Sequence, residues 1–153
     1  MTIVKWAVPA ALLLILLYLA ALSWIHRNHS IKAIDQRAIE PCRNKPNCVS
    51  SNDSRNDFRV EPWPLLADGA DPSWQRLIDT TLRAGGQILV NERGYLHAVF
   101  TSRIFRYRDD FEAQLMPDSI AVRSASRAGT SDLGVNRKRT SALRADYLSA
   151  QAE

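Results

Sequence analysis

The sequence predicts an α+β fold: an antiparallel β-meander with one or two packed helices, preceded by an N-terminal transmembrane helix. Three observations lead to this prediction. An apolar run opens the chain, four segments of alternating polarity lie between residues 87 and 127, and segments with helical apolar spacing flank those four. We divide the chain into a transmembrane anchor over 1–26, a juxtamembrane linker over 27–40 and a globular domain over 41–153.

The apolar run extends from about Val4 to Ile25, and its centre carries no charged residue. About 20 such residues are enough to span the roughly 30 Å hydrocarbon core of a bilayer. Trp6 and Trp24 stand near its two ends, as interfacial aromatic residues do. A cleaved signal peptide is the alternative, but its apolar region is shorter, about 7–15 residues, and ends in small residues. The run therefore favours an uncleaved, single-pass transmembrane helix.

The orientation of that helix depends on two opposing observations. Basic residues after the run, such as Arg27 and Lys32, favour a domain inside the cell. Cys42 and Cys48 lie in a short loop rich in Pro and Asn, which is typical of a disulfide in an oxidising compartment. A zinc site is a poor alternative, because the three histidines supply no second ligand cluster. We therefore expect a Cys42–Cys48 disulfide, no metal and a periplasmic domain.

The globular domain is expected to begin near Pro41 and to continue with a short edge strand over residues 58–65, interrupted by prolines. Asp71 is the candidate N-cap of a helix that has Pro72 in its first turn. Apolar residues at helical spacing give this helix one buried face, and Gly85-Gly86 ends it.

Four strands and a closing helix account for the rest of the domain. Polar and apolar residues alternate along the predicted strands, so that Phe111 and Ala113 face one side of the sheet while Asp110 and Glu112 face the other. The predicted strands are Gln87–Asn91, Tyr95–Arg103, Arg108–Met116 and Ile120–Arg127, and the last helix is Asn136–Ala150.

The charge of the chain does not indicate a nucleic-acid partner. The chain carries 20 Lys and Arg against 16 Asp and Glu, a formal net charge of +4. From Pro41 onwards there are 16 basic and 14 acidic residues, a difference of only +2, and the two signs are mixed along the chain. The sequence also lacks the basic stretches interleaved with aromatic residues that bind single strands.

The densest polar stretch runs from Arg123 to Arg139 and is predicted to join the last strand to the last helix. Backbone N–H groups at the start of a helix carry partial positive charge and suit anions. One interpretation is therefore an anion or lipid-headgroup site. The other is that Asp132 and Asn136 cap the helix while the arginines pair with carboxylates. The candidate ligand-binding residues are Arg123, Ser124, Ser126, Arg127, Asp132, Asn136, Arg137 and Arg139.

A second candidate site is the polar cluster of His97, Asp109, Asp110 and Glu112. Asp110 and Glu112 share a sheet face, where they can pair with arginines of the neighbouring strand and stabilise the sheet. Carboxylates that meet in a cleft could instead perform acid–base chemistry. No nucleophile-elbow pattern surrounds the nearby serines, so the sequence predicts no serine–histidine triad and assigns no catalytic residue.

Five short motifs carry a resemblance to a known family. They are Pro-Asn-Cys-Val-Ser-Ser from Pro46, Tyr-Leu-His-Ala from Tyr95, Asp-Asp-Phe-Glu from Asp109, Arg-Ser-Ala-Ser-Arg from Arg123 and Ser-Asp-Leu-Gly-Val-Asn-Arg-Lys-Arg from Ser131. In this order they resemble the family called domain of unknown function 1499, found in bacteria and plastids. The resemblance implies an envelope or organelle domain, often behind an N-terminal membrane or export segment. It implies no established activity and no catalytic residue.

We therefore expect a non-enzymatic binding or accessory module, anchored in the bacterial inner membrane through its N-terminal helix. The expected ligand is an anionic small molecule or a lipid headgroup, without a cofactor or nucleic acid. The alternative is a hydrolase or transferase that uses His97 and the carboxylates. A structure distinguishes the two, because an enzyme needs a concave pocket where His97 and a carboxylate converge.

Overall fold

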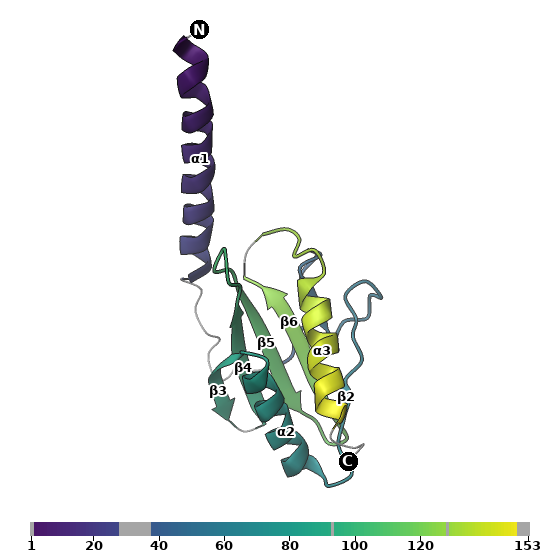
Figure 1. Cartoon of the computed structure of the whole chain (residues 1–153). Coiled ribbons are helices and arrows are strands. Elements are labelled where there is room, and N and C mark those ends of the chain that lie inside the picture. The colour runs from purple at the N-terminus through teal and green to yellow at the C-terminus, as the bar shows by residue number, and fades with distance from the viewer. Residues whose placement is uncertain (1, 28–37, 93, 128, 150–153) are drawn as a thin grey trace.

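The computed structural model describes residues 2–27, 38–92, 94–127 and 129–149 (Figure 1). The apolar run forms helix α1 (Thr2–Arg27). Its large apolar side chains between Trp6 and Tyr18 are exposed. The side chains of α1 are described from residue 6 to residue 21 only, and no helix in the described part of the chain is long and apolar enough to cross a membrane.

The domain is built on one antiparallel sheet with the strand order β1-β6-β5-β4-β3, and β2 also pairs with β6. The central meander of four strands confirms the sequence prediction. The strands are β1 (Cys48–Ser50), β2 (Trp63–Pro64), β3 (Gln87–Glu92), β4 (Tyr95–Thr101), β5 (Arg108–Leu115) and β6 (Ser119–Ser126), and the helices are α2 (Ala70–Arg83) and α3 (Val135–Ser149).

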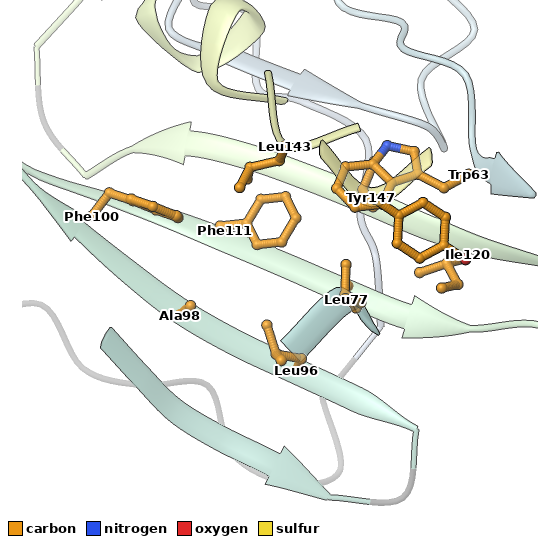
Figure 2. Close-up of a cluster of buried hydrophobic side chains, with 11 residues drawn as sticks. Trp63, Leu77, Leu96, Ala98, Phe100, Phe111, Ile120, Leu143 and Tyr147 are labelled. Atoms are coloured by element: carbon orange, nitrogen blue, oxygen red, sulfur yellow. The ribbon is translucent and has the colours of Figure 1, made fainter. Parts of the chain in front are cut away.

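Both helices of the domain cover the same face of the sheet, so the fold has two layers (Figure 1). The hydrophobic core lies between the layers (Figure 2). Leu77 of α2 and Tyr147 of α3 pack there against Phe111 of β5, and all three side chains are fully buried. Burial of such apolar side chains is the main term that holds helices to a sheet. The predicted alternation along β5 is confirmed.

The other face of the sheet, called here the outer face, is partly covered by the chain segment that leads into β1. Ile39 packs with Val90 and Tyr95 at one end of this face. Cys42 and Cys48 pack against Ala125, further along β6. Ile39 is only 3% exposed, so residues that we assigned to the linker already contact the domain.

Two local predictions need correction. Asp71 is not the N-cap of α2: the helix begins at Ala70, and its N-cap is Gly69, whose φ of 103° is readily adopted by glycine. The carbonyl of Gly69 accepts a hydrogen bond from the Ser73 hydroxyl, which fixes this earlier start. The predicted strand over residues 58–65 is reduced to the two residues of β2 and one bridge at Arg59, because its prolines donate no ladder hydrogen bonds.

Candidate functional site

The predicted site residues are divided between the two faces of the sheet. Neighbouring residues on a strand point to opposite faces. Asp109 therefore faces α3, whereas Asp110 and Glu112 lie on the outer face together with His97, which is paired with Glu112 across the β4–β5 ladder. The four residues of the predicted polar cluster consequently belong to two different networks.

The network on the helix side is centred on Asn136, which is fully buried at the start of α3. Its side-chain amide donates to the Asn47 carbonyl and to the Ser126 hydroxyl, both at 3.0 Å. Its carbonyl oxygen accepts from the Ser124 hydroxyl at 2.6 Å and from Arg139 at 2.8 Å. A single side chain thus ties the helix to β6 and to the loop before β1.

Carboxylates complete this network. Asp109 accepts hydrogen bonds from the Ser126 hydroxyl at 2.6 Å and from Arg139 at 2.7 Å. Asp132 accepts from the backbone N–H groups of Gly134 and Asn136, at 2.9 and 2.7 Å, which confirms its predicted role at the helix start. Asn136, which we expected to be a cap as well, lies inside α3 and is itself capped by Asp132. No buried side-chain atom of this network lacks a partner. These residues therefore brace the junction between β6 and α3.

Arg137 lies apart from both networks. It is exposed, and its guanidinium donates to the backbone carbonyls of Asp57 and Arg59 at 2.7 and 3.0 Å. These bonds attach α3 to the segment that precedes β2. Arg137 thus contributes to neither of the two networks.

The outer-face network is centred on Asp110. The Arg127 guanidinium donates to both carboxylate oxygens, at distances of 2.8 to 3.1 Å. His97 Nε2 lies 2.7 Å from the same carboxylate. Burial raises the pKa of Asp110, but the hydrogen bonds from His97 and Arg127 outweigh it, so the pKa lies below its ordinary value.

Glu112 forms the second half of this network. It accepts a hydrogen bond from the Tyr95 hydroxyl at 2.6 Å and pairs with Arg123. The side chain of Glu112 is only 3% exposed and that of Arg123 14%. Two nitrogen atoms here have no hydrogen-bond partner although they are buried: Nδ1 of His97 and Nε of Arg123. A buried donor or acceptor without a partner is costly, and in a native structure it calls for an explanation such as a catalytic role or a bound water or ion.

These residues line a pocket of about 290 Å³ on the outer face. The segment before β1 forms its other wall, where Arg43 and Lys45 of the disulfide loop are exposed and make no ion pair with the described residues. Besides these two, the lining residues are Glu40, Pro41, Asn47, Cys48, His97, Asp110, Glu112, Arg123, Ala125, Ser126, Arg127 and Gly129.

The pocket joins members of both predicted groups and leaves the others out. From the predicted ligand-binding stretch, three residues line it: Arg123, Ser126 and Arg127. The other members do not line it, and these are Ser124, Asp132, Asn136, Arg137 and Arg139, together with Asp109 of the polar cluster.

The wall of the pocket formed by the disulfide loop was not predicted from the sequence. The predicted Cys42–Cys48 disulfide is confirmed. The signal for the wall was present in the two basic residues between the cysteines, Arg43 and Lys45. Nothing in a loop sequence, however, says which face of the sheet the loop covers.

The chemistry available in the pocket is limited. Within the described part of the chain, no group of three or more His, Cys, Asp or Glu side chains could hold a metal ion. Ser126 is the one hydroxyl among the lining residues, and it already donates to Asp109. The pocket therefore offers cations, paired carboxylates and one imidazole nitrogen, and its one lining hydroxyl is already engaged.

The fold and the pocket together define a small α+β domain with helices on one sheet face and a polar, cation-lined pocket on the other. The chain belongs to the family described as protein of unknown function (DUF1499), whose model matches residues 38–147. This match covers the domain almost completely and includes both networks. No curated protein matches the chain.

Proposed function

We propose that this protein is a membrane-anchored envelope module that binds a small anionic ligand, or the headgroup of an anionic lipid, in the outer-face pocket. The observation that carries the proposal is the set of cations around one concavity. Arg43 and Lys45 have no carboxylate partner among the described residues, and Arg123 has a buried Nε without an acceptor. An anion placed there would accept charge-assisted hydrogen bonds, which are stronger than neutral ones.

The charge balance of the pocket supports an anion rather than a cation. Asp110 is paired with Arg127 and Glu112 with Arg123, so the carboxylates deep in the pocket are already neutralised. Beyond these pairs, the positive charges of Arg43 and Lys45 stand against one further lining carboxylate, that of Glu40, so the charged side chains around the pocket sum to +1. Positive charge on the wall of a concave site raises the local concentration of anions.

The proposed anchor and compartment rest on the sequence. The apolar run contains about 20 residues without a charge, the length that a bilayer requires. The disulfide of the domain is of the kind that persists outside the cytoplasm. We propose a single-pass protein of the bacterial inner membrane with its domain in the periplasm, where anionic headgroups lie close to the pocket.

A second candidate function is that of a hydrolase or transferase, and one observation favours it. His97 Nε2 is held by Asp110, while Nδ1 is buried without a partner in the pocket. When Nε2 carries the proton and donates a hydrogen bond to Asp110, Nδ1 of the neutral imidazole is an acceptor. A carboxylate that orients an imidazole in this way is typical of general bases, and water would be the nucleophile.

One experiment addresses both candidates. We expect the full-length chain in zwitterionic detergent micelles to bind inorganic phosphate or glycerol 3-phosphate, measured by calorimetry. Replacing both Arg43 and Lys45 by Gln should weaken binding about tenfold or more, because each charge-assisted hydrogen bond contributes about 1.5–3 kcal/mol. The matched control is Lys138→Gln, an exposed cation of α3 outside the pocket, which should bind as the wild type does.

The outcomes separate the two functions. Absence of binding by the wild type, or equal binding by the double variant, would overturn the anion site. The same preparations are incubated with a panel of phosphate and carboxylate esters. Turnover that is lost in His97→Gln while the fold is retained would favour the enzyme instead.

A further inference from the structure

A second groove lies between α3 and the segment that enters β2, away from the outer face. It has a volume of about 360 Å³, and none of its lining residues lines the outer-face pocket. Its walls include Arg59 and Glu61 before β2, Trp63 in β2, and Arg137 and Arg144 on α3. We call it the α3 groove.

Two buried donors of this groove have no acceptor in the described part of the chain. Trp63 is fully buried, and its indole Nε1 has no hydrogen-bond partner. Figure 2 shows this nitrogen at the edge of the core cluster, turned away from the ring of Tyr147. Nε of Arg144 is also buried and without a partner. Buried indole N–H groups normally find a partner, and leaving such a donor unpaired costs about 1–3 kcal/mol.

The charges of the groove are of one predominant sign. Arg59 is paired with Glu61 at 3.4 Å, and both side chains are well exposed. Arg137 donates to backbone carbonyls, and no carboxylate of the described residues forms an ion pair with it. Arg144 makes no ion pair with the described residues. The groove therefore contains two guanidinium groups without a carboxylate partner among the described residues, those of Arg137 and Arg144, and the Arg144 group itself carries one of the two unpaired donors.

We propose that the α3 groove is a second anion-binding site, which takes an oxyanion such as a carboxylate or a phosphate group. One oxygen of the anion accepts from Trp63 Nε1 and another from Arg144 Nε, while the charge of Arg137 adds long-range attraction. The two donors and the positive field call for one ligand with at least two acceptor oxygens and a negative charge. The site is independent of the outer-face pocket.

The indole N–H of Trp63 is itself the probe for the test. Isotope-labelled full-length chain in zwitterionic micelles is titrated with phosphate or acetate at constant ionic strength, and the indole signals are followed by magnetic resonance. We expect a saturable shift of the Trp63 signal. Trp74 is the internal reference, because its indole N–H already donates to the Asn91 side chain at 3.0 Å.

Substitutions of Arg144 test whether the shift of the Trp63 signal arises from binding in the α3 groove. Arg144→Gln should weaken the apparent affinity about tenfold or more, since it removes a charged donor. Arg144→Lys, which keeps the charge but lacks Nε, should fall between Gln and the wild type. Arg76→Gln is the matched control, because Arg76 also has a buried Nε without a partner but lies on α2, outside the groove.

Two further titrations test where the anion comes from and whether the groove is independent of the outer-face pocket. Micelles that contain an anionic phospholipid should shift the Trp63 signal without added salt when a headgroup reaches the groove, and leave it unshifted when the ligand is a free anion. The Arg43→Gln and Lys45→Gln double variant should leave the Trp63 titration unchanged, even if it binds nothing in the outer-face pocket. A titration without saturation, or one unchanged in both Arg144 variants, would overturn the proposal.

Discussion

Asp53 is a buried carboxylate that organises the start of the domain, although it lies in an irregular loop. It accepts a hydrogen bond from the backbone N–H of Cys42 at 2.8 Å and from the Arg55 side chain at 2.7 and 2.9 Å. The hydrogen bond from Arg55 outweighs burial and holds the pKa of Asp53 well below its usual range. The ion pair therefore fixes the disulfide loop, and with it one wall of the outer-face pocket.

The pKa of Asp53 predicts a pH dependence of stability. Its folded-state pKa lies below the value of about 3.9 expected in the unfolded chain, so the stabilisation is present above that value and is lost as the pH falls below it. Asp53→Asn should therefore lower the free energy of unfolding at neutral pH, and the difference from the wild type should shrink under acid conditions.

The measurement is urea unfolding of both proteins at a series of pH values. Asp57→Asn is the matched control, because Asp57 is an exposed carboxylate of the same loop. A difference in free energy of unfolding between wild type and Asp53→Asn that stays the same from neutral to acid pH would contradict this account.

At the residue scale, the sequence could predict pairs that follow from strand periodicity. That Asp110 and Glu112 share a face with Arg123 and Arg127 followed from the alternation of side chains on neighbouring strands, whereas the individual pairs, Asp110 with Arg127 and Glu112 with Arg123, are seen only in the structure. The same alternation separates Asp109 from Asp110, although the two are adjacent in sequence. The Asp53 network could not be predicted, because its partners are set by an irregular loop.

At the scale of elements, α3 is held to the sheet both by its apolar face and by the polar network of Asn136. Leu143 and Tyr147 supply the apolar contacts. Burial raises the pKa of Tyr147, whose hydroxyl donates to the Pro64 carbonyl at 2.9 Å. Asn136 joins α3 to β6 and to the loop before β1, so it links three segments that are distant in sequence.

Removal of the Asn136 side chain should therefore be strongly destabilising. Asn136→Ala leaves several buried groups without partners, and each such group costs about 1–3 kcal/mol, so we expect a loss of about 2–4 kcal/mol in the free energy of unfolding. Lys138→Ala, at an exposed position of the same helix, should change it by about 0.5 kcal/mol or less. Urea unfolding at neutral pH measures both, and similar effects of the two substitutions would be inconsistent with a bracing network.

The order of the elements was predictable, but their exact edges were not. The meander from β3 to β6 follows from alternation and turn residues, which are local signals. β1 has three buried residues in succession, Cys48 to Ser50, and so shows no alternation. It is a strand because it pairs with β6, far along the chain. The start of α2 at Ala70 likewise depends on its N-cap, Gly69, which has a positive φ and offers no side-chain cap that the sequence could reveal.

At the scale of the whole molecule, the two sheet faces have different partners. The helices seal one face with a hydrophobic core, while the segment before β1 covers only part of the other (Figure 1). This incomplete cover creates the outer-face pocket. The position of the segment could not be predicted, because the path of this segment across the outer face is fixed by long-range contacts such as those of Ile39 and Cys42.

The apolar run predicts that this domain is attached to a membrane. The apolar run is free of charge over a length that suits a bilayer, so the full-length chain should stay with the membrane fraction after carbonate washing. A charge at the centre of the run is costly: Leu14→Arg should cost about 2.5–3.5 kcal/mol of insertion free energy and release part of the protein, whereas Leu14→Ile should not.

Orientation is tested on the same membranes. With the domain in the periplasm, Cys42 and Cys48 should resist alkylation until a reductant is added, because their disulfide persists there. Thiols that react at once in intact membranes would place the domain in a reducing compartment. A shortened form of the protein, recovered without the apolar run in the periplasmic fraction, would instead show that the run is a cleaved signal. In that case the anionic ligand of the outer-face pocket would have to be a free molecule, since no anchor would hold the domain beside lipid headgroups.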